Sequence, residues 1–161
     1  IYEWSIAVND AIEDIVKGVP PFPGVRESLN RLKGKADMLV VSQTPAEALE
    51  REWSEHGIVD GVRVIAGQEM GTKTMHLKLA AAGRYPAERI LMIGDAPGDQ
   101  KAAKANGALF FPVNPGSEEA SWQIFPGEGI DRFFAGTYAG EFEQKLADTF
   151  DVSLPKDSPW K

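Results

Sequence analysis

Residues 89–100 read Arg-Ile-Leu-Met-Ile-Gly-Asp-Ala-Pro-Gly-Asp-Gln, and they decide how the rest of the chain is interpreted. The apolar run 90–93 predicts a short buried strand. Gly94 lets the backbone turn, and Pro97 suits the first turn of a helix, where a missing N–H costs nothing. Asp95 and Asp99 are thereby presented at the carboxyl end of a strand, beside the positive end of a helix dipole.

These two carboxylates have a structural and a functional interpretation. An Asp after a strand often caps the next helix, and an Asp in the first turn favours the helix dipole. In an open α/β sheet, however, ligands bind at the carboxyl ends of the strands, where paired carboxylates can hold Mg²⁺. The stretch alone leaves both interpretations open, and other parts of the chain move the balance.

Length and composition set the outer limits. A chain of 161 residues suits one domain, and 43% hydrophobic residues are enough for a sizeable core. The formal net charge of −7 argues against nucleic acid or an anionic membrane as the main partner. The chain has no cysteine, no apolar run near the ~18 residues of a membrane span and no visible signal peptide. We therefore expect a cytoplasmic protein.

Strand and helix patterns alternate along the chain. The apolar runs at 38–41, 62–66 and 108–113 predict three more strands, of the kind buried on both faces of a parallel sheet. Helices are predicted at 24–33, 44–56, 73–82 and 98–106. This order predicts an α/β fold with a doubly wound parallel sheet over residues 21–113.

Helices are expected on both sides of this core. Residues 2–17 carry an amphipathic helical pattern that begins without an initiator Met, so we expect residues upstream. Beyond the core, 116–125 predicts a short helix and 128–150 a longer one, with Phe134, Tyr138 and Phe142 as its packing face. Residues 114–161 are thus predicted to be a helical extension packed on the core.

Ser42, Gln43 and Thr44 follow the strand predicted at 38–41. Hydroxyls in such a turn can simply satisfy backbone N–H groups. At the carboxyl end of a strand, a hydroxyl and nearby amides can also bind an oxyanion such as phosphate. The three residues are therefore candidates for substrate binding.

Lys73 stands at the start of a predicted helix, where a cation opposes the helix dipole. That misfit favours a functional role, whereas Lys78 fits a solvated surface charge. His56 and His76 lie on predicted helices with no second ligand nearby, and we expect neither to bind metal or act as a base.

The order of these motifs resembles the haloacid dehalogenase superfamily, whose members are mostly Mg²⁺-dependent phosphatases. The resemblance covers about residues 22–113, and the phrase Pro-Phe-Pro-Gly-Val-Arg-Glu-Ser-Leu at 21–29 is similar to the segment that precedes the second motif. It implies a Rossmann-like core, and residues 1–20 would be the remnant of a helical cap.

The resemblance also implies roles for single residues. Ser42 matches the hydroxyl that binds the transferring phosphoryl group, and Lys73 the lysine that neutralises phosphoryl charge, with Lys78 as a fallback. Asp95 matches a Mg²⁺ ligand, and Asp99 its partner, which acts through water or by positioning the lysine. Positioning and charge neutralisation are what phosphoryl transfer requires.

The first motif of that superfamily is absent. It is an apolar strand ending in Asp-x-Asp, which supplies the nucleophile and the general acid/base, and no Asp-x-Asp occurs in the 161 residues. The missing strand would lie between those of Val40 and Met92. We therefore expect a gap there, or a strand from a second polypeptide, and not direct pairing of the two strands.

The sequence thus predicts the larger part of a phosphatase acting on a small phosphorylated metabolite, a fragment inactive on its own. The alternative is a non-catalytic module that binds phosphate or a nucleotide. An unrelated Rossmann-like fold is disfavoured, because neither Gly-x-Gly-x-x-Gly nor Gly-x-x-x-x-Gly-Lys-Ser/Thr is present.

Overall fold

The computed structural model of the chain describes residues 18–81 and 83–154. The helix predicted at 2–17, with most of the presumed cap remnant, lies outside these residues, as does the tail from 155 to 161. Over the described part, no helix is long and apolar enough to cross a membrane.

The predicted strands and core helices are present, and their bounds differ from the predicted ones by at most two residues. The strands are β1 (Leu39–Val41), β2 (Val64–Ala66), β3 (Leu91–Gly94) and β4 (Leu109–Pro112). The helices between them are α2 (Val25–Leu32), α3 (Ala46–Glu55), α4 (Lys73–Ala81) and α5 (Pro97–Ala105). The α/β class with short parallel strands is therefore confirmed.

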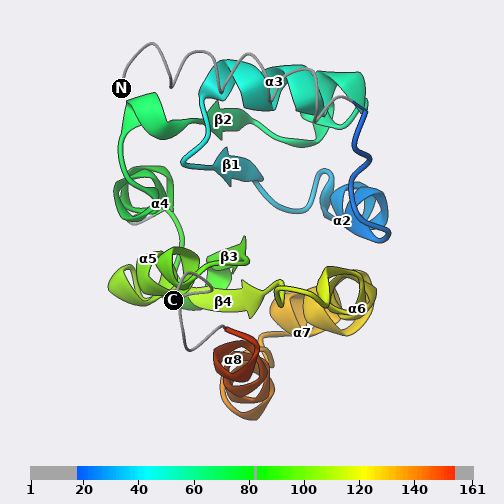
Figure 1. The fold of residues 1–161 in the computed structure, drawn as a ribbon. Helices are drawn as coiled ribbons and strands as arrows, with labels where there is room; N and C mark the ends of the chain where they lie inside the picture. The colour runs from blue at the N-terminus through cyan, green and yellow to red at the C-terminus, as the bar shows by residue number, and fades with distance from the viewer. Residues whose placement is uncertain (1–17, 82, 155–161) are drawn as a thin grey trace, which may run out of the picture.

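The four strands form two separate sheets and not the single doubly wound sheet that we predicted. β1 pairs in parallel with β2, and β3 pairs in parallel with β4. In Figure 1 the spatial order is β2, β1, β3, β4, with α4 and α2 on opposite sides of the space between β1 and β3. Within the described chain no strand joins the two pairs, so the predicted absence of direct β1–β3 pairing is confirmed.

The core is centred on β3 and β4. All four residues of β4 are buried, and Phe111 is fully enclosed. One apolar cluster packs α4, α5 and Phe150 around Met92 and Phe110. Val41 also packs against this cluster, which brings β1 into contact with the other half of the molecule. A second cluster gathers Phe111, Phe125, Ile130 and Tyr138.

The single helix predicted at 128–150 is wrong. The chain forms α6 (Glu118–Ile124), a π-helical turn (Phe125–Gly129), α7 (Ile130–Ala135) and then α8 (Glu141–Ser153). The break comes at Gly136 and Gly140, which have φ angles of 72° and 92°, a region that strongly favours glycine. Tyr138 lies in the loop between them and is 1% exposed, so the predicted packing role holds without the helix.

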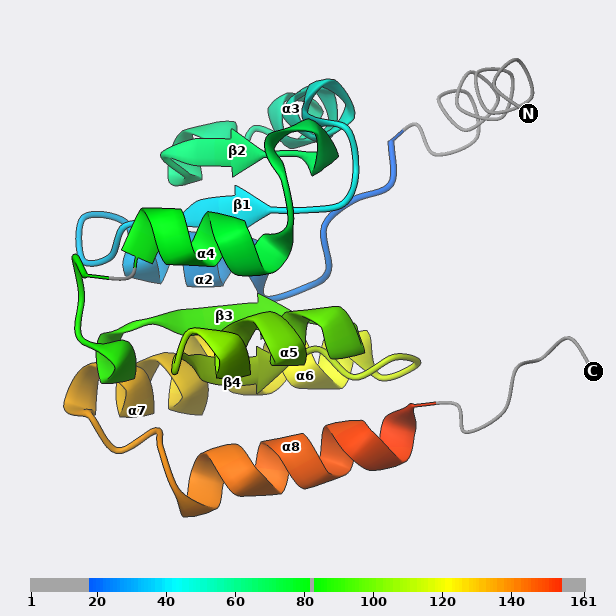
Figure 2. The ribbon, with the colours of Figure 1, turned by 90° about the vertical axis from the view of Figure 1, so that its left-hand side faces the viewer.

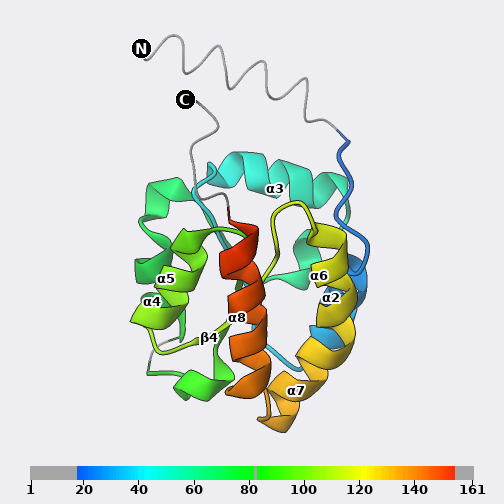
Figure 3. The same cartoon turned by 60° about the horizontal axis from the view of Figure 1, so that its bottom comes forward.

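The outer edge of β4 is closed by side chains from the C-terminal region. Glu143 of α8 accepts a hydrogen bond from the Phe110 N–H at 2.9 Å. The Tyr138 hydroxyl donates to the Phe110 carbonyl, also at 2.9 Å. Figure 3 shows α8 lying in front of β4, between α5 and the α6–α7 pair. The sheet edge is therefore protected from pairing with another strand.

Candidate functional site

The predicted site residues lie at the carboxyl ends of the strands. Ser42 follows β1, Asp95 follows β3, Lys73 is the first residue of α4 and Asp99 lies in the first turn of α5. Figure 2 shows β1 and β3 pointing the same way, so both strands end on one side of the molecule. Ligands bind on this side of open α/β sheets.

Lys73 and Asp99 are brought together. The Lys73 ammonium donates a hydrogen bond of 2.6 Å to Oδ1 of Asp99. Asp99 is almost fully buried, whereas 22% of the Lys73 side chain is exposed. The ion pair compensates the unfavourable dipole that Lys73 meets at the start of α4. It also presents an ammonium group to solvent next to a carboxylate that fixes its position.

Asp99 is held from its second oxygen as well. Its Oδ2 accepts a hydrogen bond from the Ala96 N–H at 3.2 Å, so it caps the N-terminus of α5. A Cβ on Gly94 would lie 2.3 Å from Cγ of Asp99. Gly94 is not among the glycines with a positive φ angle, which corrects our first explanation for it. Glycine is needed there to make room for Asp99.

Asp95 differs from Asp99 in every respect. It is exposed, and no hydrogen bond or ion pair of its carboxylate is present in the described chain. Both its oxygens are therefore available to a ligand. The stretch that follows β3 thus carries one carboxylate that is enclosed and paired and one that is open.

The Ser42 hydroxyl accepts a hydrogen bond from the Thr44 N–H at 3.1 Å. Its own proton remains free to donate to an oxyanion. Gln43 reaches the carbonyl of Gly71 at 3.4 Å, which links this turn to the loop before Lys73. Gln43 and Thr44 are both exposed, and the structure shows no hydrogen bond from either side chain to Lys73, Asp95 or Asp99 in the described residues.

Lys78 is exposed in the last turn of α4 and makes no ion pair with the acidic residues after β3. The geometry therefore favours Lys73 over Lys78 for the charge-neutralising position. His76 is buried, with no hydrogen-bond partner on either ring nitrogen within the described residues. Neither His76 nor His56 reaches a group of possible metal ligands there.

Three residues near the site were not predicted from the sequence. Glu69 accepts from the Ala46 N–H, with both oxygens 3.3 Å away, and so occupies the N-terminus of α3. Thr72 caps α4 by accepting from the Met75 N–H. A Cβ on Gly67 would lie 2.3 Å from the Ala46 nitrogen. The Gly-Gln-Glu-Met-Gly-Thr pattern at 67–72 marked a loop but not these contacts.

The donors present suit a hard cation only in part. Mg²⁺ is commonly held by one or two carboxylates together with waters and substrate phosphate oxygens. Asp95 meets that need, whereas both oxygens of Asp99 are already engaged. No group of three Asp, Glu, His or Cys side chains able to hold a metal occurs in the described structure. Asp95 is therefore the residue that could bind Mg²⁺ directly.

Comparison with known proteins identifies the family of the chain. The sequence model of the family "Haloacid dehalogenase-like hydrolase" matches residues 2–113, which include every site residue discussed above. No curated protein and no solved structure matches the chain. The match covers well over half of the 161 residues. The chain therefore belongs to the haloacid dehalogenase-like hydrolases.

Proposed function

We propose that the chain is the larger part of a Mg²⁺-dependent phosphatase acting on a small phosphorylated metabolite. The observation that carries this proposal is the contrast between two acids in the stretch that follows β3, Asp95 before α5 and Asp99 in its first turn. Asp99 is enclosed and paired with Lys73 at 2.6 Å, while Asp95 is open and unpaired in the described chain. A fixed ammonium beside a free carboxylate suits an anionic substrate that arrives with a metal ion.

Ser42 and Lys73 would bind the phosphoryl group. The Ser42 hydroxyl accepts from the Thr44 N–H, so its proton is directed to another acceptor, such as a phosphoryl oxygen. Lys73 has three N–H donors, of which Asp99 takes one. The remaining donors can neutralise charge that develops on the phosphoryl oxygens. Gln43 and Thr44 stay predicted contacts of the substrate.

Asp99 acts as a positioning residue in this proposal. Its carboxylate is buried, so its contact with Lys73 is not loosened by solvent as a surface ion pair would be. Asp95 would hold Mg²⁺ together with water and substrate oxygens. The ion, when bound, would lower the negative charge that an attacking carboxylate must approach.

The nucleophile would come from a strand placed between β1 and β3. Their pairing leaves one edge of each strand free in the described chain, and those edges lie next to each other in the spatial order of the strands (Figure 1). Family resemblance implies an apolar strand ending in Asp-x-Asp at this place. Its source is another part of the gene product or a second polypeptide, and the chain alone should show little or no turnover.

A non-catalytic phosphate-binding module remains a second candidate, on one specific observation. The 161 residues contain no Asp-x-Asp, so this sequence does not itself supply the nucleophile motif that the family resemblance implies. Such a module would keep Ser42, Lys73 and Asp95 for binding alone. The coding sequence upstream of Ile1 separates the two candidates, since an Asp-x-Asp strand there supports the enzyme.

The sharpest test is Asp95→Asn in the full-length gene product, assayed with Mg²⁺ and a generic phosphate ester. Because Asp95 is exposed and unpaired, the variant should keep its stability within about 0.5 kcal/mol. Activity should nevertheless fall at least about a hundredfold, as expected when a charge-stabilising group is removed. Near-normal activity in this variant would remove Asp95 from the metal site.

Lys73→Ala and Lys78→Ala form a matched pair on the same helix. The first should abolish activity, and it should also destabilise the fold by about 3 kcal/mol because Asp99 is left buried and unpaired. The second should change neither property, since Lys78 is exposed. Thermal unfolding of each variant separates lost chemistry from lost folding. Activity that survives in Lys73→Ala but not in Lys78→Ala would reverse the assignment.

A further inference from the structure

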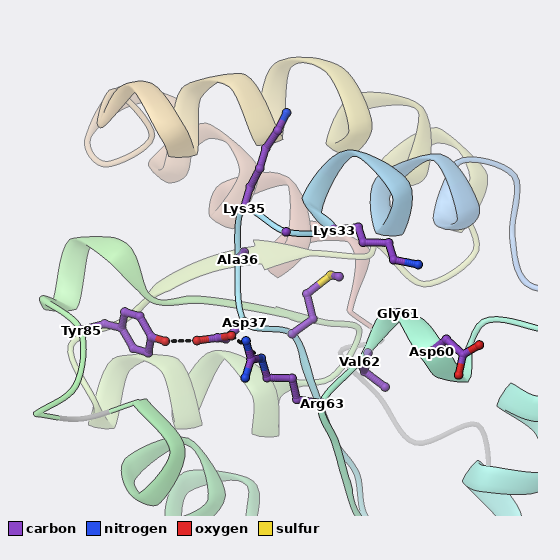
Figure 4. Close-up of a pocket in the computed structure, with 11 residues that line it drawn as sticks. Lys33, Lys35, Ala36, Asp37, Asp60, Gly61, Val62, Arg63 and Tyr85 are labelled. Atoms are coloured by element: carbon purple, nitrogen blue, oxygen red, sulfur yellow. Dashed lines mark hydrogen bonds and ion pairs between the residues drawn. The ribbon is translucent and has the colours of Figure 1, made fainter.

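A hollow lies at the opposite end of the strands from the candidate site. Its volume is about 360 Å³, and it is formed by the loop that leads into β1, the turn that leads into β2, and Tyr85 (Figure 4). Hollows of this size are in the range that binds small molecules. Ser42, Lys73 and Asp95 are not part of its lining.

The lining carries an excess of positive charge. Lys33, Lys35 and Arg63 contribute three cations, and Asp37 and Asp60 contribute two carboxylates. The whole chain has a formal net charge of −7, so this balance is opposite in sign to that of the molecule. A small anion is therefore less strongly repelled in this hollow than over most of the negatively charged surface.

The Arg63 side chain is 76% exposed and offers its guanidinium group to a planar anion. Its Nε pairs with Asp37, whose other oxygen accepts a hydrogen bond from the Tyr85 hydroxyl. Figure 4 shows Asp37 between Tyr85 and Arg63. That hydrogen bond raises the pKa of Tyr85, so the phenol stays protonated and keeps Asp37 in place. No partner of the two terminal nitrogens of Arg63 is present in the described residues, and such a fork binds carboxylate or phosphate oxygens in pairs.

The hollow also has an apolar wall. Met38 and Val62, which precede β1 and β2, line it and are both partly buried. Lys33 and Lys35 are exposed and come from the same loop as Asp37. An anionic head group and a short apolar body can thus be accommodated together.

We propose that this hollow binds a small organic oxyanion, a metabolite with a phosphate or carboxylate group, through Arg63, in the positive field to which the exposed Lys33 and Lys35 contribute. The site is independent of the proposed phosphatase function, because it lies at the amino ends of β1 and β2 and shares no residue with the first site. A phosphate group and a carboxylate group would accept the same hydrogen bonds here. One probe of each kind tells which of the two the hollow binds.

The test is a titration of the ¹⁵N-labelled chain followed by NMR, with pyrophosphate in one series and citrate in another. The amides of Gly34 and Gly61, both in the lining, should shift and saturate with at least one probe. Those of Gly71 and Gly94 report the candidate phosphoryl site. Saturation at Gly34 and Gly61 supports the proposal whatever happens at Gly71 and Gly94.

Arg63→Gln should weaken binding at the hollow about tenfold, the loss expected for one charge-assisted pair of hydrogen bonds. Lys35→Gln leaves the Asp37 ion pair intact, and it should weaken binding about threefold. Lys104→Gln, an exposed lysine on α5, is the matched control and should bind like the unmodified chain. Unshifted Gly34 and Gly61 amides with both probes, or equal affinity in all three variants, would overturn the proposal.

Discussion

The outer edge of β4 differs from the inner edges of β1 and β3 in what covers it. The outer edge of β4 is closed by Glu143 and Tyr138, which bond to the N–H and the carbonyl of Phe110. The inner edges of β1 and β3 have no strand beside them in the described chain. Unpaired edges invite pairing with other chains, and proteins usually cover them. The described chain thus closes one edge with two side chains and leaves two others without a partner strand, which is the contrast that our proposal of an added strand rests on.

Burial follows the same division. Phe111 in β4 is fully enclosed, whereas Leu39 in β1 and Val64 in β2 are 38% and 43% exposed. The paired residues Leu39 and Val64 share one face of their sheet. The β3–β4 half, with α5 and the C-terminal helices, therefore has a finished core, and the β1–β2 half does not.

The largest effect should come from truncating the finished core. Phe111→Ala should lower the free energy of unfolding by about 3–5 kcal/mol, because a large cavity is left between β4 and Phe125. Leu39→Ala should lower it by less than about 1 kcal/mol, since Leu39 is already half in solvent. Urea unfolding of both variants measures this difference. Similar losses in the two would mean that both halves are equally complete.

A smaller effect is expected from opening the closed edge. Glu143→Ala leaves the buried Phe110 N–H without its acceptor, which should lower the free energy of unfolding by about 1–3 kcal/mol. Glu143→Gln keeps an amide oxygen in place and should restore most of that loss. Chemical denaturation compares the two. If Glu143→Gln is as damaging as Glu143→Ala, the carboxylate acts by its charge and not by accepting this bond.

The last effect is expected from pH, and it is confined to alkaline solution. Burial, followed by the negative charge of Glu143, raises the pKa of Tyr138 far above its ordinary value of 10.0. The contribution of protonated Tyr138 to the free energy of unfolding is therefore complete below pH 10. Above pH 10 it is lost by about 1.4 kcal/mol per pH unit. Tyr138→Phe removes this dependence but also the hydrogen bond to Phe110. The difference between the two stability curves should be flat below pH 10 and fall above it. A constant difference would show that Tyr138 titrates normally.

Much of the fold could be predicted because buried parallel strands are continuous apolar runs. Each of the four strands was found within two residues of its predicted start, since turn residues mark both ends of each run. The prediction of one long C-terminal helix at 128–150 was wrong for a physical reason. The fourfold spacing of Phe134, Tyr138 and Phe142 imitates a helical face, and the glycines at 136 and 140 break the helix between them.

The parts of the site that are formed by residues close in the sequence could be predicted. Contacts between residues far apart in the sequence could not. Asp95, Asp99 and the capping geometry of α5 follow from twelve consecutive residues. The pairing of Lys73 with Asp99 joins residues 26 positions apart, and only family resemblance indicated it. The closure of β4 by Glu143 spans 33 positions and has no signal in the sequence.

Amide hydrogen exchange is the measurement that tests the open edges most directly. Hydrogen bonds from Ser42 to Ala66 and from Val113 to Gly94 show which residues of β1 and β3 face their partner strands. Successive residues of a strand direct their N–H groups alternately to its two edges. The amides of Leu39, Val41, Leu91 and Ile93 therefore point to the inner edges of β1 and β3. Val40 and Met92, which face their partners, are the internal controls.

In the chain alone, the four inner amides should exchange quickly while Met92 stays protected. Coexpression with a polypeptide that supplies the proposed Asp-x-Asp strand should slow all four at least a hundredfold, because a new strand would accept their hydrogen bonds. Inner amides that are already as slow as Met92 in the chain alone would contradict the account, since β1 and β3 would then need no further strand.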